Sequence, residues 1–142
     1  MGRKTPGAAL TDWIHQMAAG RRTAACQDMG RPGFSGQQSM AICMSAKAKP
    51  EFTAEHRAFA TYGIRPSTPV SVVAAHVTGT KAIASAKDVH VSGTTLYSLM
   101  MAHSTGVKPG QFTVTFQLAR IQGNWYVSGM NIGGGTSVNI GS

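Results

Sequence analysis

The spacing of the hydrophobic positions changes about halfway along this chain. In the first half, apolar side chains such as Trp13, Ile14 and Met17 recur at the spacing of one helix face. From Pro69 onward, apolar and polar residues alternate, which is the pattern of strands with one buried face. We therefore expect helices first and strands afterwards, the segregated order of an α+β fold.

Capping and helix-breaking residues indicate where the helices begin and end. Ser and Thr side chains accept hydrogen bonds from the free N–H groups of a first helical turn, and glycine often follows a last turn. On this basis we place helix starts at Thr11, at Ser35 or Gly36 and at Thr53, with breaks at Gly20, at 30–33 and at Gly63.

The clearest strand pair lies at 111–132. Its first strand alternates apolar residues such as Phe112, Val114 and Phe116 with polar ones, and the turn sequence Gln-Gly-Asn at 122–124 tolerates the positive φ of a tight hairpin. Weaker alternation predicts three more strands, at 69–78, 83–91 and 96–103. The residues expected in the core are Phe112, Val114, Phe116, Leu118, Trp125 and Val127 on the sheet, and Trp13, Ile14, Met17, Met40 and Met44 on the helices.

The length of 142 residues fits one domain with its own core. We expect this domain at 9–132, with flexible ends at 1–8 and in the Gly-rich segment 133–142. The sequence contains no run of about 18 apolar residues, so it predicts no membrane span. The basic start is not followed by an apolar stretch, so it is not a complete signal peptide. Either the protein is cytoplasmic, or its export signal or anchor is absent from this sequence.

Thirteen basic residues against five acidic ones give a net charge of +8. Such an excess could attract nucleic acid, anionic lipid or a cell-wall polymer. However, the basic residues are scattered, and aromatic residues are not interleaved with them as base stacking requires. The pattern favours a solvated basic surface over an anion-binding face, and it does not favour nucleic acid as a partner.

The chain has two cysteines, Cys26 and Cys43, which lie in neighbouring predicted helices. Without a second cysteine pair or a histidine cluster, they do not have the spacing of a zinc site. They are either two buried thiols of a cytosolic protein or one disulfide of an exported protein. The small residues beside them, such as Ala25 and Ala46, allow close helix packing and favour the disulfide.

The order of three helices and a long meander ending in FQLARIQGNWYVSGM resembles the nuclear transport factor 2-like superfamily over 9–132. With Ala24-Ala25-Cys26 and Cys43, the chain also looks like small exported domains of actinobacterial envelope proteins. It is similar, too, to the extracytoplasmic domain of the bitopic component of conjugation and type IV secretion machines. The resemblance implies a curved antiparallel sheet of four to six strands, with the helices in its concavity, forming a cone with a pocket.

Enzymes of that superfamily, such as ketosteroid isomerases, cyclases and epoxide hydrolases, place an acid or base inside the cone. Four of the five acids here, Asp12, Asp28, Glu51 and Glu55, have sequence positions typical of caps or helix surfaces. This leaves Asp88 as the acidic candidate.

Asp88 and His90 are two residues apart on a predicted strand, so they share a face and could act as a carboxylate and a general base. The valines between and after them take the other face, which favours a solvated pair. His76 and His103 extend apolar series to predicted strand ends, where a cone would open. No motif predicts a cofactor, and no short-spaced ligand pair predicts a metal.

The sequence therefore favours a non-catalytic, protein-binding domain of a cell-envelope or conjugation and secretion assembly. Its partners would be other protein subunits, further copies of itself among them. The alternative is a small-molecule isomerase, cyclase or hydrolase that binds a small apolar ligand inside the cone. An apolar pocket that holds an ionisable side chain would favour the enzyme over the protein-binding domain.

Overall fold

The computed structural model describes residues 2–103, 112–133 and 136–138. They form an α+β fold, as predicted. Its helices are α1 (Pro6–Ala18), α2 (Arg22–Gln27), α3 (Gly36–Cys43), α4 (Lys49–Thr61), the 3-10 turn η1 (Ala86–Asp88) and α5 (Leu96–Ala102). Its strands are β1 (Val70–Val72), β2 (His76–Thr78), β3 (Lys81–Ser85), β4 (Val89–Val91), β5 (Thr94–Thr95), β6 (Val114–Ile121), β7 (Asn124–Ile132) and β8 (Thr136–Val138).

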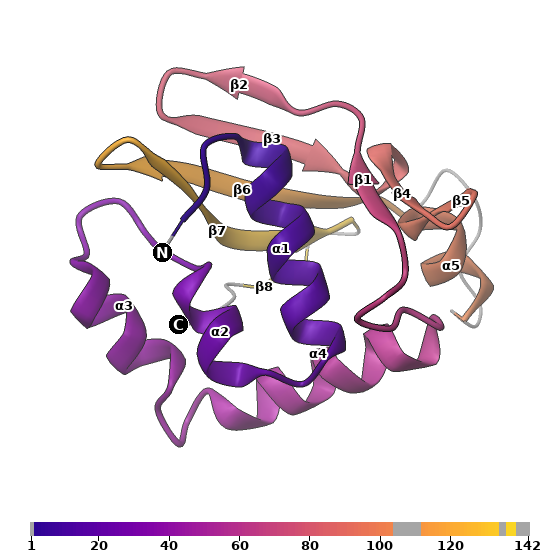
Figure 1. Ribbon diagram of the computed structural model, residues 1–142, viewed down its shortest axis with the longest axis horizontal. Helices are drawn as coiled ribbons and strands as arrows, with labels where there is room; N and C mark the ends of the chain where they lie inside the picture. The colour runs from indigo at the N-terminus through magenta and orange to yellow at the C-terminus, as the bar shows by residue number, and fades with distance from the viewer. Residues whose placement is uncertain (1, 104–111, 134–135, 139–142) are drawn as a thin grey trace.

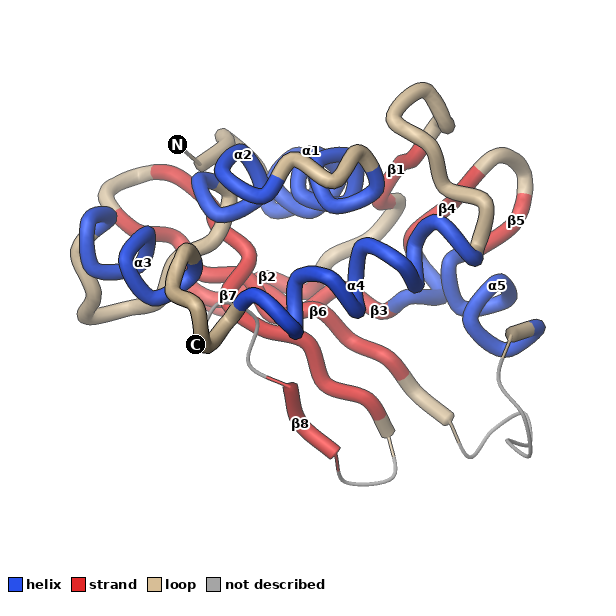
Figure 2. The backbone as a smooth tube through the Cα atoms, turned by 90° about the horizontal axis from the view of Figure 1, so that it is seen from below, coloured by secondary structure: helices blue, strands red, loops and turns tan. Residues whose placement is uncertain are grey.

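The strands form two antiparallel sheets. The larger has the order β2-β3-β6-β7-β8 and the smaller the order β1-β4-β5. Helices α1, α2 and α4 lie together on one side of the larger sheet (Figure 1; Figure 2). We call the sheet face toward these helices the inner face and the opposite one the outer face.

The central hairpin of β6 and β7 confirms the clearest sequence prediction. Its strands are joined through Gln122 and Gly123, which have φ values of 52° and 85°. Positive φ at both central residues is what the favoured two-residue hairpin turn requires. Along β6, Val114, Phe116 and Leu118 are buried in the core, as the alternation predicted.

Two helices begin earlier than predicted. Thr5 caps α1 in place of Thr11, and its hydroxyl accepts a hydrogen bond from a first-turn N–H. Helix α4 begins before Thr53, with Pro50 in its first turn. Proline is favoured there because its missing N–H would have no partner, so Pro6 and Pro50 mark these starts better than the threonines do.

The segment 96–103, predicted as a strand, is helix α5. Thr95 caps this helix by accepting a hydrogen bond from the Ser98 N–H at 3.1 Å. Leu96 and Met100, four positions apart, are its buried residues. A short apolar run fits the period of a helix as well as that of a strand, so the capping residue decides between the two structures.

The predicted strands at 69–78 and 83–91 are each divided between the two sheets. β1 pairs with β4 in the smaller sheet, whereas β2 pairs with β3 in the larger one. The 3-10 turn η1 separates β3 from β4. Period-2 alternation continues across such a break, because it depends on which face of the chain is buried and not on which strand lies beside it. The alternation alone therefore does not show where one sheet ends and the other begins.

Both ends of the described chain pair with β7, where we expected flexible ends. Arg3 and Trp125 exchange backbone hydrogen bonds of 3.0 and 2.7 Å, and Pro6 already belongs to α1. Within the Gly-rich segment, Thr136–Val138 forms β8 along the last residues of β7. The rest of the two expected ends, residue 1 and residues 134–135 and 139–142, lies outside the described residues. An edge strand offers free N–H and C=O groups that such pairing satisfies.

The core is centred on Trp13, which is fully buried and packs edge-to-face with Phe59 and Phe116, at centroid distances of 5.8 and 6.1 Å. Most of the predicted core residues are buried. Met44 is not: its side chain is 38% exposed. The inward-facing residue of α3 is Cys43, because the disulfide described below sets the face of that helix.

Candidate functional site

The structure does not bring the predicted catalytic residues together. Asp88 ends η1, and His90 lies exposed on β4 of the smaller sheet. The flanking valines are buried, so the alternation expected for this strand is confirmed. His90 therefore faces outward from the core, and Asp88 precedes the strand that we expected them to share.

The two candidate rim histidines are also apart and exposed. His76 lies on β2, the edge strand of the larger sheet. His103 follows α5, where its Nδ1 lies 2.9 Å from the Leu99 carbonyl oxygen and its ring lies 5.6 Å from that of Tyr62. These contacts give His103 an ordinary role at a helix end.

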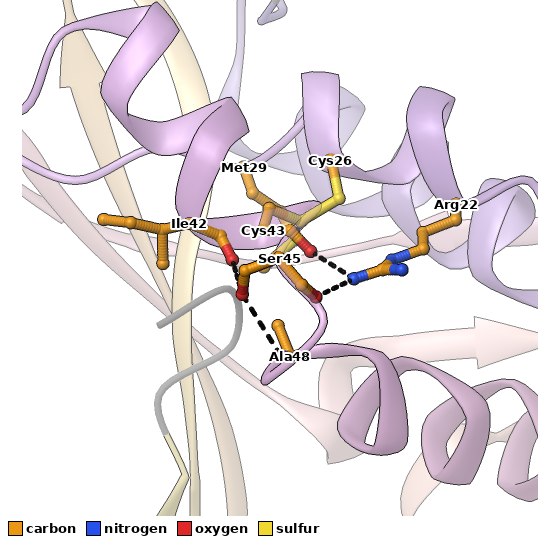
Figure 3. Close-up of a disulfide and its surroundings, with 7 residues drawn as sticks. All are labelled: Arg22, Cys26, Met29, Ile42, Cys43, Ser45 and Ala48. Atoms are coloured by element: carbon orange, nitrogen blue, oxygen red, sulfur yellow. Dashed lines mark hydrogen bonds between the residues drawn. A yellow bond between two sulfur atoms is a disulfide. The ribbon is translucent and has the colours of Figure 1, made fainter.

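Cys26 and Cys43 form a disulfide with a Cα–Cα distance of 5.7 Å, as the small neighbouring residues favoured (Figure 3). The Arg22 guanidinium donates to the carbonyl oxygens of Cys43 and Ser45, at 2.9 and 2.6 Å. The disulfide and these charge-assisted bonds hold the last turn of α3 against α2.

Within the described residues, no group of three or more His, Cys, Asp or Glu side chains could hold a metal ion. No helix in this described part of the chain has the length and apolar character needed to cross a membrane.

An apolar pocket of about 190 Å³ lies between α4 and the inner face of the larger sheet. Aromatic and methionine side chains dominate its wall, and Glu55 is the acidic residue that lines it. The lining residues are Trp13, Ala54, Glu55, Ala58, Phe59, Tyr62, Met100, Phe116, Met130 and Ile132.

Glu55 has an unusual environment for a carboxyl group. Burial and, to a smaller extent, the nearby charge of Glu51 together raise its pKa to about 7. A carboxyl with such a pKa exchanges protons near neutral pH, as a general acid or base does. We had expected Glu55 on a helix surface, whereas the structure shows it half-buried and lining this pocket.

A second unexpected carboxyl lies at the end of α2. The Asp28 side chain is only 3% exposed. Burial and a hydrogen bond to Asp12 raise the pKa of Asp28 to about 8. The same hydrogen bond, together with Arg3, lowers the pKa of Asp12, which binds Arg3 at 2.8 Å. The pair fastens the N-terminal residues to α1 and α2.

A groove of about 540 Å³ lies on the outer face, and we call it the outer groove. The Gln117 side chain lies on the outer face, because Gln117 alternates along β6 with Phe116 and Leu118, which are buried. The loop after α2 forms the wall. The lining residues are Arg31, Pro32, Phe34, Lys81, Ala82, Ile83, Gln117, Leu118, Ala119 and Ser128.

The outer groove combines exposed apolar and basic side chains. Phe34 and Ile83 are 37% and 49% exposed. The Arg31 guanidinium lies 5.8 Å from the centre of the Phe34 ring, which holds both at the wall of the groove. Ala119 is 1% exposed yet lies outside the core, because it faces the groove side of β6.

In comparisons with protein-family models, with curated proteins and with solved structures, nothing matches this chain.

The sequence held a signal for Glu55 that the helix-surface interpretation overlooked. Phe52, Phe59 and Tyr62 lie three positions before Glu55 and four and seven after it, which is the spacing of one helix face. No such periodicity pointed to Asp28, because its burial comes from residues far away in the chain. The backbone carbonyl of Asp28 accepts from the Val127 N–H at 2.9 Å.

Proposed function

We propose that this chain is a non-catalytic protein-binding domain of a cell-envelope or conjugation and secretion assembly, with a nuclear transport factor 2-like fold. The observation that carries this proposal is the outer groove. Exposed apolar side chains that gather in one hollow, beside polar and basic ones, are typical of interaction sites. Its volume also falls within the range of binding clefts.

An extracytoplasmic location fits the disulfide. Disulfides persist in oxidising compartments and are reduced in most cytosols. The bond between Cys26 and Cys43 joins α3 to α2, whose Ala25 and Cys26 are buried in the core, so it helps to hold α3 in place. We therefore place the proposed assembly outside the cytoplasm.

The proposal is tested by site-specific photo-crosslinking in the cells that make the protein. A photoreactive amino acid at Gln117, in the outer groove, should yield a discrete adduct with another protein, identified by mass spectrometry. The same amino acid at Ser71, exposed on β1 of the other sheet, is the matched control. The adduct should disappear in Ile83→Asp with the fold retained by circular dichroism. Equal adducts from both positions would contradict a binding role for the groove.

The second candidate function is a small-molecule isomerase, cyclase or hydrolase, and the pocket beside Glu55 favours it. That pocket is an apolar hollow holding one carboxyl of raised pKa. Binding of the apolar dye 8-anilinonaphthalene-1-sulfonate would test whether the pocket admits a ligand. Ala58→Trp should fill the pocket and abolish binding, whereas Ala60→Trp, at an exposed position of the same helix, should not. Dye binding that both variants retain would remove this candidate.

A further inference from the structure

The chemistry of the outer groove also indicates which kind of partner it takes. We infer that the groove binds an acidic segment of another protein, with an apolar side chain seated between Phe34 and Ile83 and carboxylates facing Arg31 and Lys81. This inference rests on the proposed protein-binding function and specifies its partner.

The charge of the groove is one-sided. Arg31 and Lys81 line it, and no acidic residue does. The five acids of the chain are elsewhere: two form the pair of Asp12 and Asp28, two lie on α4 and one ends η1. A hollow with one sign of charge concentrates the field and attracts segments of the opposite sign.

The apolar part of the groove requires more than charge from its partner. Phe34 on the wall and Ile83 on β3 both stay substantially exposed. A purely acidic polymer would leave these apolar surfaces in water. A segment carrying Leu or a similar residue would bury them, and burial of apolar area supplies affinity.

The experiment uses short synthetic peptides and isothermal titration calorimetry on the whole chain. The test peptide combines Glu and Leu; one comparison peptide replaces each Glu by Gln, and another replaces each Leu by Ala. The test peptide should bind, and each replacement should weaken binding on the order of tenfold. Raising the salt concentration should weaken the binding of the Glu-containing peptides only, because salt screens exposed charges.

Charge reversal at one lysine gives a matched pair of variants. Lys81→Glu should weaken binding of the test peptide on the order of tenfold, because its side chain lines the groove. Lys47→Glu makes the same change of net charge at an exposed position between α3 and α4, and it should leave the affinity within about twofold. Equal weakening in both would show only general attraction to a basic protein and would overturn the inference.

The remaining outcomes separate this inference from the proposed function. An adduct at Gln117 that Lys81→Glu leaves unchanged keeps the groove as a protein-binding site but rejects an acidic partner. Equal binding of the Ala-containing peptide would show a site for acidic polymers and would overturn the seated apolar side chain. An adduct between two copies of this chain, with no peptide binding, would assign the groove to self-association and would also overturn it.

Discussion

The carboxyl group of Asp28 is buried in a hydrogen bond with that of Asp12, which binds the guanidinium of Arg3. Two carboxyl groups this close share one proton, because two neighbouring negative charges would repel each other in a site with little water. Asp28 keeps the proton, since its burial disfavours the charged form more strongly. The carboxyl group of Asp28 therefore keeps its proton to a higher pH than an ordinary aspartate does.

This pair predicts a pH-dependent stability. Between about pH 4 and the pKa of Asp28 of about 8, the folded protein holds a proton that the unfolded chain has released. The contribution of Asp28 to stability therefore falls as the pH rises through this window. Asp28→Asn cannot ionise, so it should raise the free energy of unfolding at pH 8 relative to wild type and flatten the dependence. Urea unfolding at pH 5 and pH 8 measures both effects.

The matched control for this prediction is Asp88→Asn, which makes the same change of charge at the end of η1. It should leave the difference between the two pH values as it is in wild type. If Asp28→Asn shows the same pH dependence as wild type, the shared proton is absent.

Loss of the disulfide should destabilise the protein by about 3 kcal/mol, the value for a closed loop of this size. The double substitution Cys26→Ala and Cys43→Ala gives this result by removing a constraint on the unfolded chain. Urea unfolding with and without reductant measures it. Reductant should lower the stability of wild type and leave the double variant unchanged. If reductant lowered the stability of both proteins equally, the loss would not come from this disulfide.

Gly123→Ala should destabilise the protein by about 1 kcal/mol, because Gly123 has a φ of 85° in the hairpin turn and alanine is strained there. The control is Gly36→Ala at the first position of α3, where an added Cβ meets nothing within 4 Å. This change should be neutral or slightly stabilising, since alanine restricts the unfolded chain. Thermal unfolding of both variants checks the prediction, and equal losses would contradict it.

Glu55→Gln should remove a loss of stability that wild type shows as the pH rises toward 7. Burial raises the pKa of Glu55 to about 7, so above its ordinary value the folded state binds a proton that the unfolded chain lacks. We expect the variant to exceed wild type in stability at pH 8 and to match it near pH 4. Chemical denaturation across this range provides the measurement.

Glu51→Gln is the matched control one helical turn before Glu55. It removes the neighbouring charge, so it should lower the pKa of Glu55 and shift the midpoint of the pH dependence downward. A midpoint that stays in place in this variant would mean that burial alone sets the pKa of Glu55.

Local patterns were sufficient where one element fixes its own structure. The hairpin was predictable because its alternation and the Gln122-Gly123 turn depend on neighbouring residues only. Segment 96–103 was predicted wrongly because its apolar residues fit the spacing of a helix and of a strand, and the Thr95 cap selects the helix. The pairing of Cys26 with Cys43 was favoured by small residues that let the two helices approach.

The sequence by itself determined the α+β class, the central hairpin and the order of helices before strands, because hydrophobic period and turn chemistry act over a few residues. Only the tertiary structure decided which acidic residues have a raised pKa. Asp28 has ordinary sequence neighbours, and the aromatic helix face beside Glu55 shows only that this residue could be covered. The raised pKa of each carboxyl comes first from its burial in the folded protein. The outer groove also depends on the tertiary structure, because it forms only where the loop of Arg31 and Phe34 crosses β3, β6 and β7. Desolvation and concavity depend on what packs against a residue, and that is a property of the whole fold.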